Sequence, residues 1–411
     1  MTRFGFATLA AALLAGGAAM AADHPGQKFQ ISPASLAKPY ATPAAGNQSD
    51  TIPRPAGAMP EVPKGFSVSV FADKLSDARW MAVAPNGDVF LAEPTREGGK
   101  ITVLRDSNAD GKADKTFTFS ATGWVYPHGL AFHGGYLYVG DLRGIWRIPY
   151  KDGQTAAQGA PEKVTTKVAD LRPKGNHVTR DIAFAPDGGL YLALGSRDNI
   201  SDFKPGAQVF KINADGSMSE FASGIRNPVG IAFAPGTSTL YVVTNERDGL
   251  GDDLPPDYLT SVKAGGFYGY PYAYTGKNPD PVWGAKDPGG KVASAITPDV
   301  LFHAHSAPVG LAFYTGSNFP AEYRGDAFVS LHGSWNAGNP TGYKVVRVHF
   351  VNGKPQNAYE NFATGFWPGK GGNGEPAQVW GRPAGLAVAK DGSLLIADDV
   401  ANVVWRVTYT G

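Results

Sequence analysis

The chain has 411 residues, of which 43% are hydrophobic, 18% charged and 11% aromatic, so it can bury a large core and is not a disordered chain. Its 37 basic and 36 acidic side chains give a formal net charge of +1, which excludes a broadly basic surface for nucleic acid or membranes. It has no cysteine, which excludes thiol catalysis, thiolate zinc sites, iron–sulfur clusters and covalently attached haem.

The first 22 residues have the pattern of a secretory signal peptide. Arg3 precedes an apolar run from Phe6 to Ala15, and the small residues Ala19 to Ala22 end the segment. A membrane anchor, the alternative, would need about 18 or more apolar residues. We therefore expect cleavage near Ala21 and a periplasmic or secreted protein with no transmembrane span.

Residues 23–63 form a Pro-rich N-terminal extension, with eight prolines among Ala, Ser, Gly and Gln. Such a composition buries too little apolar surface to fold by itself. The extension is expected to be either a tether or a tail that wraps the domain at residues 64–411.

One phrase recurs along this domain: an apolar residue, Ala and a second apolar residue, then a Gly-containing turn and an alternating apolar strand. Six alanines mark the copies: Ala82, Ala131, Ala183, Ala232, Ala312 and Ala387. Each copy predicts two antiparallel strands joined by a tight turn, and several are followed by a third strand, such as "GIWRIPY" and "YKVVRVHF". A repeat of about 40 to 50 residues with four strands is typical of a propeller blade.

The repeat predicts an all-β fold, a six-bladed β-propeller with four-stranded antiparallel blades around a central funnel. The segment "GFSVSVFA" from Gly65 is expected to pair with the last blade and close the ring. The segments from about Asp248 to His305 and from about Pro340 to Val379 are expected to be loops on one face. Helices are expected to be almost absent.

The inner strand of a blade begins near the mouth of the funnel, so residues just before each anchor alanine should face it. These residues are rich in Arg and His: Arg79, His128, His177, Arg180, Arg226, Asn227, His305, Ser306 and Arg382. His177 is either a general base or a hydrogen-bonded structural histidine. Arg226 and Arg382 either hold a planar polyanion or form salt bridges between blades.

Two segments are rich in the oxygen ligands that calcium prefers. "TNERDGLGDDLPPDYL", from Thr244, is either a calcium site or an acidic loop. "DSNADGKAD", from Asp106 to Asp114, has a spacing like that of an EF-hand loop, although Phe117 stands where that loop has its bidentate Glu. It is either a structural calcium loop or a polar turn.

Several aromatic side chains have two possible roles. Trp335, in "HGSWN", either packs in the core or stacks on a flat ligand. The aromatic residues between Tyr268 and Trp283 either stack on a sugar ring or pack their own loop. The sequence has no nucleophile elbow, Gly-rich phosphate loop or HExxH helix, so hydrolase and nucleotide-binding functions lack their usual motifs.

Four segments, "NHVTRDIAFAPDGGLYLALGSRDN", "GIRNPVGIAFAP", "TNERDGLGDD…GGFYGYPYAY" and "HSAPVGLAFY…FVSLHGSWN", resemble in order and blade position the soluble sugar dehydrogenases that depend on pyrroloquinoline quinone (PQQ). The resemblance is closer to their sorbosone-dehydrogenase-like branch and extends over nearly all of the chain after about Gly65. It implies a propeller that holds PQQ and calcium in its funnel and oxidises an aldose or sugar aldehyde by hydride transfer to the quinone.

The resemblance also implies roles for single residues. His177 would be the catalytic base, Arg226 and Asn227 would hold the quinone, and Arg226 would also steady the developing oxyanion. Arg382 would bind a PQQ carboxylate, and the carbonyls of Asp248 and Gly249 would coordinate calcium.

The chain departs from the family pattern at two positions. His332, expected with His305 to contact the cofactor, stands where the soluble glucose enzymes have Lys. Ala384 stands where they have a second Arg, so the cofactor carboxylates would meet fewer cations.

Two other functions compete with this one. A calcium-dependent propeller lactonase also uses a funnel metal, but it has little use for Arg226 and Arg382 on one channel. A non-catalytic exported propeller would bind partners or glycans on its loop face. For the dehydrogenase, the expected partners are a sugar and a separate electron acceptor, either a cytochrome c or a quinone-linked protein, and no nucleic acid.

Overall fold

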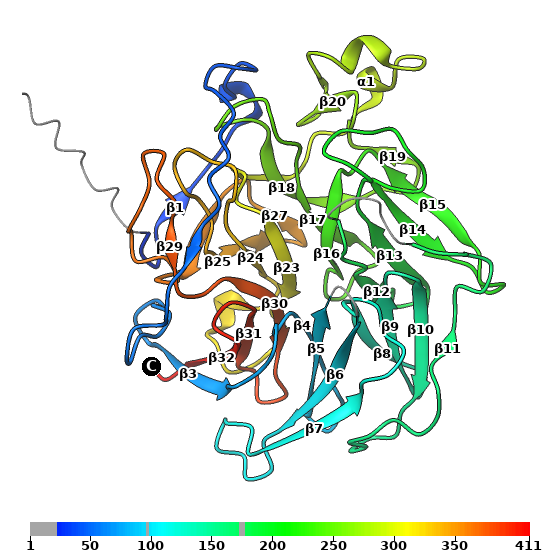
Figure 1. Cartoon of the computed structure of the whole chain (residues 1–411), viewed down its shortest axis with the longest axis vertical. Coiled ribbons are helices and arrows are strands. Elements are labelled where there is room, and N and C mark those ends of the chain that lie inside the picture. The colour runs from blue at the N-terminus through cyan, green and yellow to red at the C-terminus, as the bar shows by residue number, and fades with distance from the viewer. Residues whose placement is uncertain (1–22, 96–97, 172–176) are drawn as a thin grey trace, which may run out of the picture.

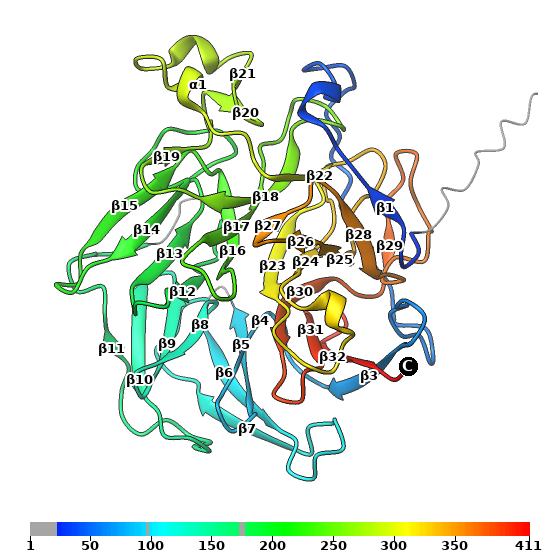
Figure 2. The ribbon, with the colours of Figure 1, turned by 180° about the vertical axis from the view of Figure 1, so that it is seen from behind.

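The computed structural model describes residues 23–95, 98–171 and 177–411. The predicted signal peptide, residues 1–22, lies outside the described residues. Six sheets of four or five strands surround a central axis (Figures 1 and 2), which confirms the predicted all-β, six-bladed propeller. No helix among the described residues is long and apolar enough to cross a membrane.

The first three blades follow the chain from the inner strand outward. Blade 1 contains β4 (Trp80–Val83), β5 (Val89–Thr95), β6 (Gly98–Arg105) and β7 (Lys115–Ser120). Blade 2 contains β8 (Leu130–His133), β9 (Tyr136–Asp141), β10 (Gly144–Pro149) and β11 (Glu162–Lys163). Blade 3 contains β12 (Ile182–Phe184), β13 (Leu190–Leu194), β14 (Gln208–Ile212) and β15 (Met218–Ser223), with β19 (Gly266–Phe267) added in parallel.

The last three blades recruit strands from more distant parts of the chain. Blade 4 contains β16 (Asn227–Phe233), β17 (Leu240–Asn245), β18 (Pro256–Val262) and β22 (Val300–Ala304). Blade 5 contains β23 (Pro308–Phe313), β24 (Ala327–Leu331), β25 (Lys344–Val348), β28 (Tyr359–Ala363) and β1 (Lys28–Phe29). Blade 6 contains β30 (Pro383–Val388), β31 (Leu394–Asp398), β32 (Val403–Tyr409) and β3 (Phe66–Ala72).

The ring closes as the sequence predicts. β3 pairs antiparallel with β32, with Phe66 opposite Tyr409, so the start of the domain supplies the outer strand of the last blade. Blade 6 thus joins the two ends of the domain, and the six inner strands contact one another in a closed ring.

In four of the six blades a glycine stands two residues before the anchor alanine, and it has a steric purpose. A Cβ on Gly129 would lie 2.5 Å from the carbonyl oxygen of Arg180, and one on Gly385 would lie 2.6 Å from that of Arg79. The N–H groups of these glycines donate to the same carbonyls across the blade boundary, at 3.1 and 2.8 Å. Only a residue without a side chain lets neighbouring blades approach this closely.

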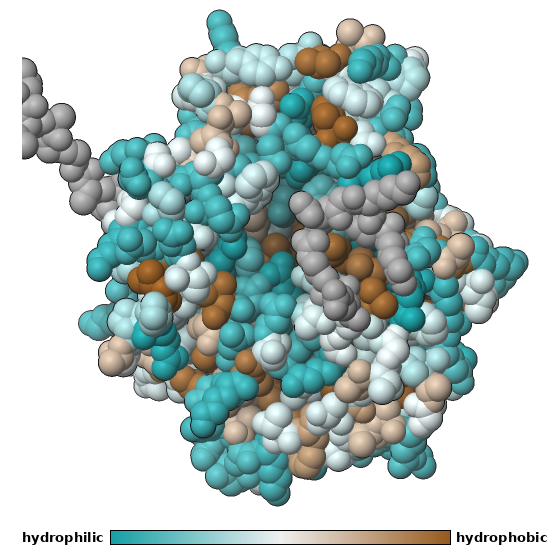
Figure 3. Space-filling view, in the orientation of Figure 1, coloured by the Kyte–Doolittle hydropathy of each residue, from teal (hydrophilic) through white to brown (hydrophobic). Residues whose placement is uncertain are grey.

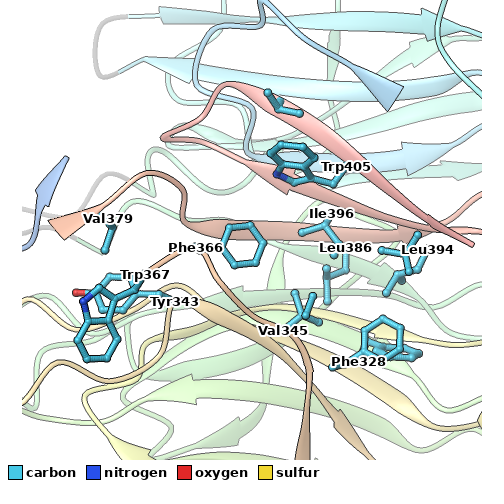
Figure 4. Close-up of a cluster of buried hydrophobic side chains, with 14 of the residues drawn as sticks. Phe328, Tyr343, Val345, Phe366, Trp367, Val379, Leu386, Leu394, Ile396 and Trp405 are labelled. Carbon is cyan, nitrogen blue, oxygen red and sulfur yellow. The ribbon is translucent and has the colours of Figure 1, made fainter. Parts of the chain in front are cut away.

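The core lies between neighbouring blades. In Figure 4, Leu394 and Ile396 of β31 and Trp405 of β32 pack toward Val345 and Phe328 of blade 5. All five side chains are almost completely buried. Burial of each such side chain stabilises the fold by about 1.5 to 3 kcal/mol, so the facing sides of the blades hold the ring together.

The expected loop segments are shorter than the sequence suggested. Residues 248–305 contain β18 and β22, and residues 340–379 contain β25 and β28, which are blade strands. The loop prediction is wrong for β18, β22 and β28, which lack the repeated phrase, whereas β25 lies in the predicted third strand "YKVVRVHF". The remaining small elements are η1 (Pro33–Ser35), β2 (Asp50–Thr51), β20 (Ala273–Tyr274), β21 (Asn278–Pro279), η2 (Gly284–Lys286), α1 (Lys291–Ser294), η3 (Ala321–Tyr323), β26 (Phe350–Val351), β27 (Lys354–Pro355) and β29 (Gln378–Val379).

The N-terminal extension lies along the propeller (blue in Figure 1). β1 pairs with β28, and the Phe29 ring stacks on Tyr359 with centroids 5.1 Å apart. β2 then pairs in parallel with β29. The extension cannot fold by itself, and its backbone is held instead by hydrogen bonds to strands of the propeller.

Candidate active site

A cavity of about 610 Å³ lies at the centre of the propeller. Its walls include residues just before the inner strands, among them Arg79, His177, Arg226, His305 and Arg382. In Figure 3 the depression at the centre of the face is bordered mostly by hydrophilic surface. In each blade the first strand starts at the end of the funnel where the antiparallel second strand ends. Residues just before the first strand and residues just after the second strand therefore both line the cavity.

The structure brings most of the predicted site residues to this cavity. Those that line it are His177, Arg226, Asn227, Asp248, His305, His332 and Arg382, whereas Gly249 is outside the lining. His128, also expected to face the funnel, is fully buried and packs against Trp80, with ring centroids 4.6 Å apart. Arg180 is buried too, and its guanidinium donates to the carbonyl oxygens of Leu171, His177 and Thr179.

His177 is held as a neutral imidazole. Its Nδ1 lies 2.7 Å from the carbonyl oxygen of Ser196, to which an Nδ1–H donates, and 3.1 Å from the Ser196 hydroxyl. Burial, and then the charge of Arg226, lower the pKa of His177 to about 3. This tautomer leaves the Nε2 lone pair as the position that accepts a proton.

Arg226 is fixed by the chain around it. Its Nε donates to the carbonyl oxygen of Asn199 at 2.9 Å, its Nη1 to that of Glu246 at 2.7 Å, and its Nη2 to Asn199 Oδ1 at 3.0 Å. The carboxylate of Asp248 lies 3.6 Å from Nη2. A guanidinium held on several sides is a preorganised charge in the cavity wall.

Two further arginines surround His332, which contacts the buried carboxylate of Asp399. Arg79 forms an ion pair with Asp399, and His332 Nε2 lies 2.9 Å from Asp399 Oδ1. Arg382 donates to the carbonyl oxygens of His332 and Gly333 at 2.9 and 2.7 Å. Burial alone would raise the pKa of Asp399, but His332 and Arg79 hold it below its ordinary value.

Sequence reasoning missed Asp399 and considered Glu246 only as a possible calcium ligand in the segment from Thr244, although both had a recognisable position. Each directly follows the second strand of its blade, as His332 does. Glu246 lines the cavity and is 5% exposed, and burial raises the pKa of its carboxyl to about 7. Residues after the second strand therefore belong in a search for funnel residues as much as those before the first.

His305 joins two cavity loops. Its Nε2–H donates to the carbonyl oxygen of Gly251 at 2.9 Å, and its Nδ1 accepts from Asn336 Nδ2 at 3.1 Å. Asn336 also donates to the carboxylate of Asp248. His305 thus fixes the loop after β17 against the loop after β24.

The carboxylates of the two segments rich in oxygen ligands were predicted as possible calcium ligands. In the loop from Asp106 to Asp114, backbone N–H groups donate to the carboxylates, including Gly111 N–H to Asp106 at 2.7 Å and Ser107 N–H to Asp114 at 2.6 Å. Hydrogen bonds of this kind occur in polar turns and in calcium loops alike, so both interpretations of this loop stay predictions. Within residues 23–95, 98–171 and 177–411, no three His, Asp or Glu side chains are grouped to hold a metal.

The tyrosines expected either to stack on a ligand or to pack their loop do the latter. Tyr268, Tyr270, Tyr272 and Tyr274 are between 1% and 7% exposed, and none of them lines the cavity. Trp335 differs from them, because it lines the cavity and is 50% exposed.

The family model described as TrAA12-like matches residues 60–410. The chain belongs to the TrAA12-like family. This family assignment, with the relatives and solved structures that follow, confirms the resemblance to the soluble PQQ-dependent sugar dehydrogenases.

Two relatives match most of their own length. An uncharacterized protein of Borreliella burgdorferi is 30% identical over 364 residues, which is 85% of this chain and 90% of that protein. The aldose sugar dehydrogenase YliI of Escherichia coli is 29% identical over 310 residues, which is 64% of this chain and 77% of that protein.

Two solved structures share the fold. The holo form of the PQQ domain of pyranose dehydrogenase from Coprinopsis cinerea has a TM-score of 0.70 at 20% identity and covers 87% of this chain and 98% of its own. The calcium structure of a carbohydrate-active enzyme of family AA12 from Trichoderma reesei has a TM-score of 0.69 at 19% identity, covering 85% and 97%. At this level of identity the likeness shows a common fold.

Proposed function

We propose that this TrAA12-like protein is a PQQ- and calcium-dependent dehydrogenase that oxidises an aldose or a sugar aldehyde, sorbosone being one candidate. The observation that carries the proposal is that His177 and the guanidinium groups of Arg79, Arg226 and Arg382 line a single cavity. The relatives add support, because one is named an aldose sugar dehydrogenase and one solved structure is the holo form of a PQQ domain.

The residues of the cavity suit PQQ, a flat quinone with three carboxylates. Four arginines line it, Arg79, Arg197, Arg226 and Arg382, and guanidinium is the side chain best shaped to bind a carboxylate. Arg79 and Arg197 add two cations to Arg226 and Arg382, although Ala384 stands where the glucose enzymes have a second Arg. Among the described residues, Arg79 Nε and Asn227 Oδ1 are buried without a hydrogen-bond partner, as expected of groups that await a ligand.

His177 is the group placed to move a proton. PQQ, when bound, would supply the two-electron acceptor for the hydride that leaves the sugar. The neutral His177 Nε2 would take the proton of the reacting hydroxyl, which is the anomeric hydroxyl of a cyclic aldose or a hydroxyl of the hydrated sugar aldehyde. The Ser196 carbonyl, which holds Nδ1–H, would steady the imidazolium. Arg226 would stabilise negative charge on the reacting oxygen without having to move.

The proposal includes calcium, and binding it requires a change in the hydrogen bonds around Asp248. The carbonyl oxygen of Asp248 already accepts from Asn199 Nδ2 at 3.2 Å and from Arg247 Nε at 3.0 Å. A calcium ion bound there, with the Gly249 carbonyl as its neighbour, would displace at least one of these donors. The calcium structure of the Trichoderma reesei enzyme supports a role for this ion.

Export and electron transfer complete the proposal. The predicted signal peptide would direct the protein to the periplasm or the medium. With no cysteine to attach a haem covalently, the reduced cofactor would pass its electrons to a separate cytochrome c or quinone-linked acceptor.

Neither competing function gains support from the cavity. A lactonase of the kind considered would hold its metal on side-chain ligands, and the described part of the chain offers no such group of three. A propeller that only binds partners has no need of a neutral imidazole among four arginines.

Reconstitution tests the proposal. The purified chain would be titrated with PQQ by absorbance, with and without calcium, and then assayed for dye reduction with aldoses, sorbosone and other sugar aldehydes. We expect reduction only when PQQ, calcium and a sugar are all present. His177→Ala should lower turnover by about 10² to 10⁴ while PQQ still binds, and His133→Ala, an exposed histidine, serves as the control. Absence of PQQ binding to the wild type would overturn the proposal.

A further inference from the structure

The cavity has an aromatic wall at its rim. Trp335, in the loop after β24, lines the cavity and is 50% exposed, although a large apolar side chain is normally buried. Its backbone is fixed, because the neighbouring Ser334 N–H donates to the carbonyl oxygen of Thr341 at 2.9 Å. Trp335 therefore presents an indole to the solvent in the cavity instead of packing in the core.

The N-terminal extension supplies a polar group to the same cavity. Gln48 lines it, and Asn47, one residue earlier, ties the extension to the Trp335 loop. The Asn47 N–H donates to the carbonyl oxygen of Trp335 at 2.8 Å, and its side-chain amide donates to those of Ala337 at 2.9 Å and Glu375 at 3.1 Å. Asn47 is 7% exposed, so these bonds lie out of water and hold Gln48 beside the loop.

The extension is anchored on both sides of Gln48. Before it, Tyr40 N–H donates to the carbonyl oxygen of Leu250 at 2.7 Å, and Thr42 Oγ1 accepts from Asp252 N–H at 2.8 Å. After it, Asp50 N–H donates to the carbonyl oxygen of Ala377 at 2.8 Å. The extension thus spans the loops after β17 and β24 and forms part of the cavity rim.

We propose that Trp335 and Gln48 form a subsite for the ring of a pyranose substrate at the mouth of the cavity. A pyranose has an apolar face of C–H groups that stacks on an indole, and hydroxyls at its edge that bond to an amide. The subsite rests on the proposed function, because it orients the ring of a sugar whose reacting carbon lies deeper, at His177. Asn47 is a positioning residue that holds Gln48 in place.

Steady-state kinetics of the PQQ-loaded enzyme test the subsite with two substrates. One is the aldopyranose that the wild type oxidises best, and the other is glyceraldehyde, which has no ring to stack. Trp335→Ala should raise KM for the pyranose about tenfold with kcat nearly unchanged, and should leave KM for glyceraldehyde as it is. Gln48→Ala and Asn47→Asp should raise the pyranose KM about three- to tenfold.

Control variants separate the subsite from general damage. Trp335→Phe keeps an aromatic face and should retain most of the affinity for the pyranose. Tyr40→Ala removes an aromatic side chain, 58% exposed, from the same extension but outside the cavity lining, and should change neither KM. An unchanged pyranose KM in Trp335→Ala, or an equal rise for both substrates, would overturn the subsite.

A binding measurement keeps this inference separate from the proposed function. Saturation-transfer NMR on the full chain without PQQ should detect the pyranose on the wild type and lose most of the signal in Trp335→Ala. If the wild type turned over no sugar but this signal depended on Trp335, the dehydrogenase proposal would fail and the sugar subsite would stand. A signal that was absent, or equal in both proteins, would overturn the subsite.

Discussion

Gly195 and His177 lie so close together that a Cβ atom on Gly195 would sit 2.8 Å from the Cβ of His177 and would also collide with Asn227 Oδ1. Gly195 directly follows β13, the second strand of blade 3. Its backbone therefore lies beside the residues that precede β12, the first strand of that blade. A glycine here lets the proposed base and the proposed quinone ligand approach from two different blades.

Gly195→Ala should therefore displace His177 or Asn227 while leaving the propeller folded. We expect turnover of the reconstituted enzyme to fall by about tenfold or more, since small misplacements of a positioned group are costly. Circular dichroism should be unchanged. Gly98→Ala is the control, because its nearest neighbour would be Thr95 Oγ1 at 3.6 Å, an ordinary contact. Equal activity of the two variants would show that Gly195 does not set this geometry.

His177 and His332 should not titrate at physiological pH. Burial, with Arg226, lowers the pKa of His177 to about 3, and burial, with Arg382, lowers that of His332 to about 4. Their NMR signals, assigned through His177→Gln and His332→Gln, should stay constant from pH 8 to pH 5. A midpoint near 6.5 for His177 would contradict the neutral, desolvated imidazole.

The lowered pKa values of His177 and His332 also predict that the protein loses stability in acid. Below pH 6.5 these histidines take up protons in the unfolded chain but not in the folded one, so the free energy of unfolding falls as pH falls. At pH 5 each contributes about 2 kcal/mol of this loss relative to pH 8. Urea unfolding at both values should show a smaller difference for His332→Gln than for the wild type.

Among the carboxylates of the site, Asp399 should lower the free energy of unfolding most when it is replaced by a neutral side chain. Asp399→Asn removes the buried partner of Arg79 and His332, and we expect it to lower the free energy of unfolding by about 3 kcal/mol and to weaken PQQ binding. Asp391→Asn is the matched control. Its ion pair with Arg406 is half exposed, so its loss should cost less than about 1 kcal/mol. Equal losses in urea unfolding would argue against a special role for Asp399.

Removal of calcium should affect PQQ binding more than the fold. Because the proposed ligands are backbone carbonyls, EDTA should weaken PQQ binding at least tenfold and change the thermal midpoint of the PQQ-free chain little. Asp248→Asn preserves the carbonyl and should retain calcium-dependent PQQ binding. Calcium-independent binding by the wild type would remove the ion from the proposal.

The blade repeat could be recognised from sequence because each inner hairpin is local. Alternating apolar residues, a turn and a glycine before the anchor alanine lie within a few residues of one another, so their pattern is visible in the chain. β18, β22 and β28 were mistaken for loops because they lack the repeated phrase and their partner strands belong to the tertiary structure of the blade.

By itself the sequence determined the class of fold, the closing of the ring by β3 and the residues before the inner strands that face the funnel. Only the tertiary structure decided that Asp399 unites Arg79 with His332, that His128 is buried, and that Asn47 carries Gln48 to the rim of the cavity. The physical reason is that these relationships join blades and segments far apart in the chain. Their distances are set by how six packed sheets close into a ring, and no local pattern of residues encodes them.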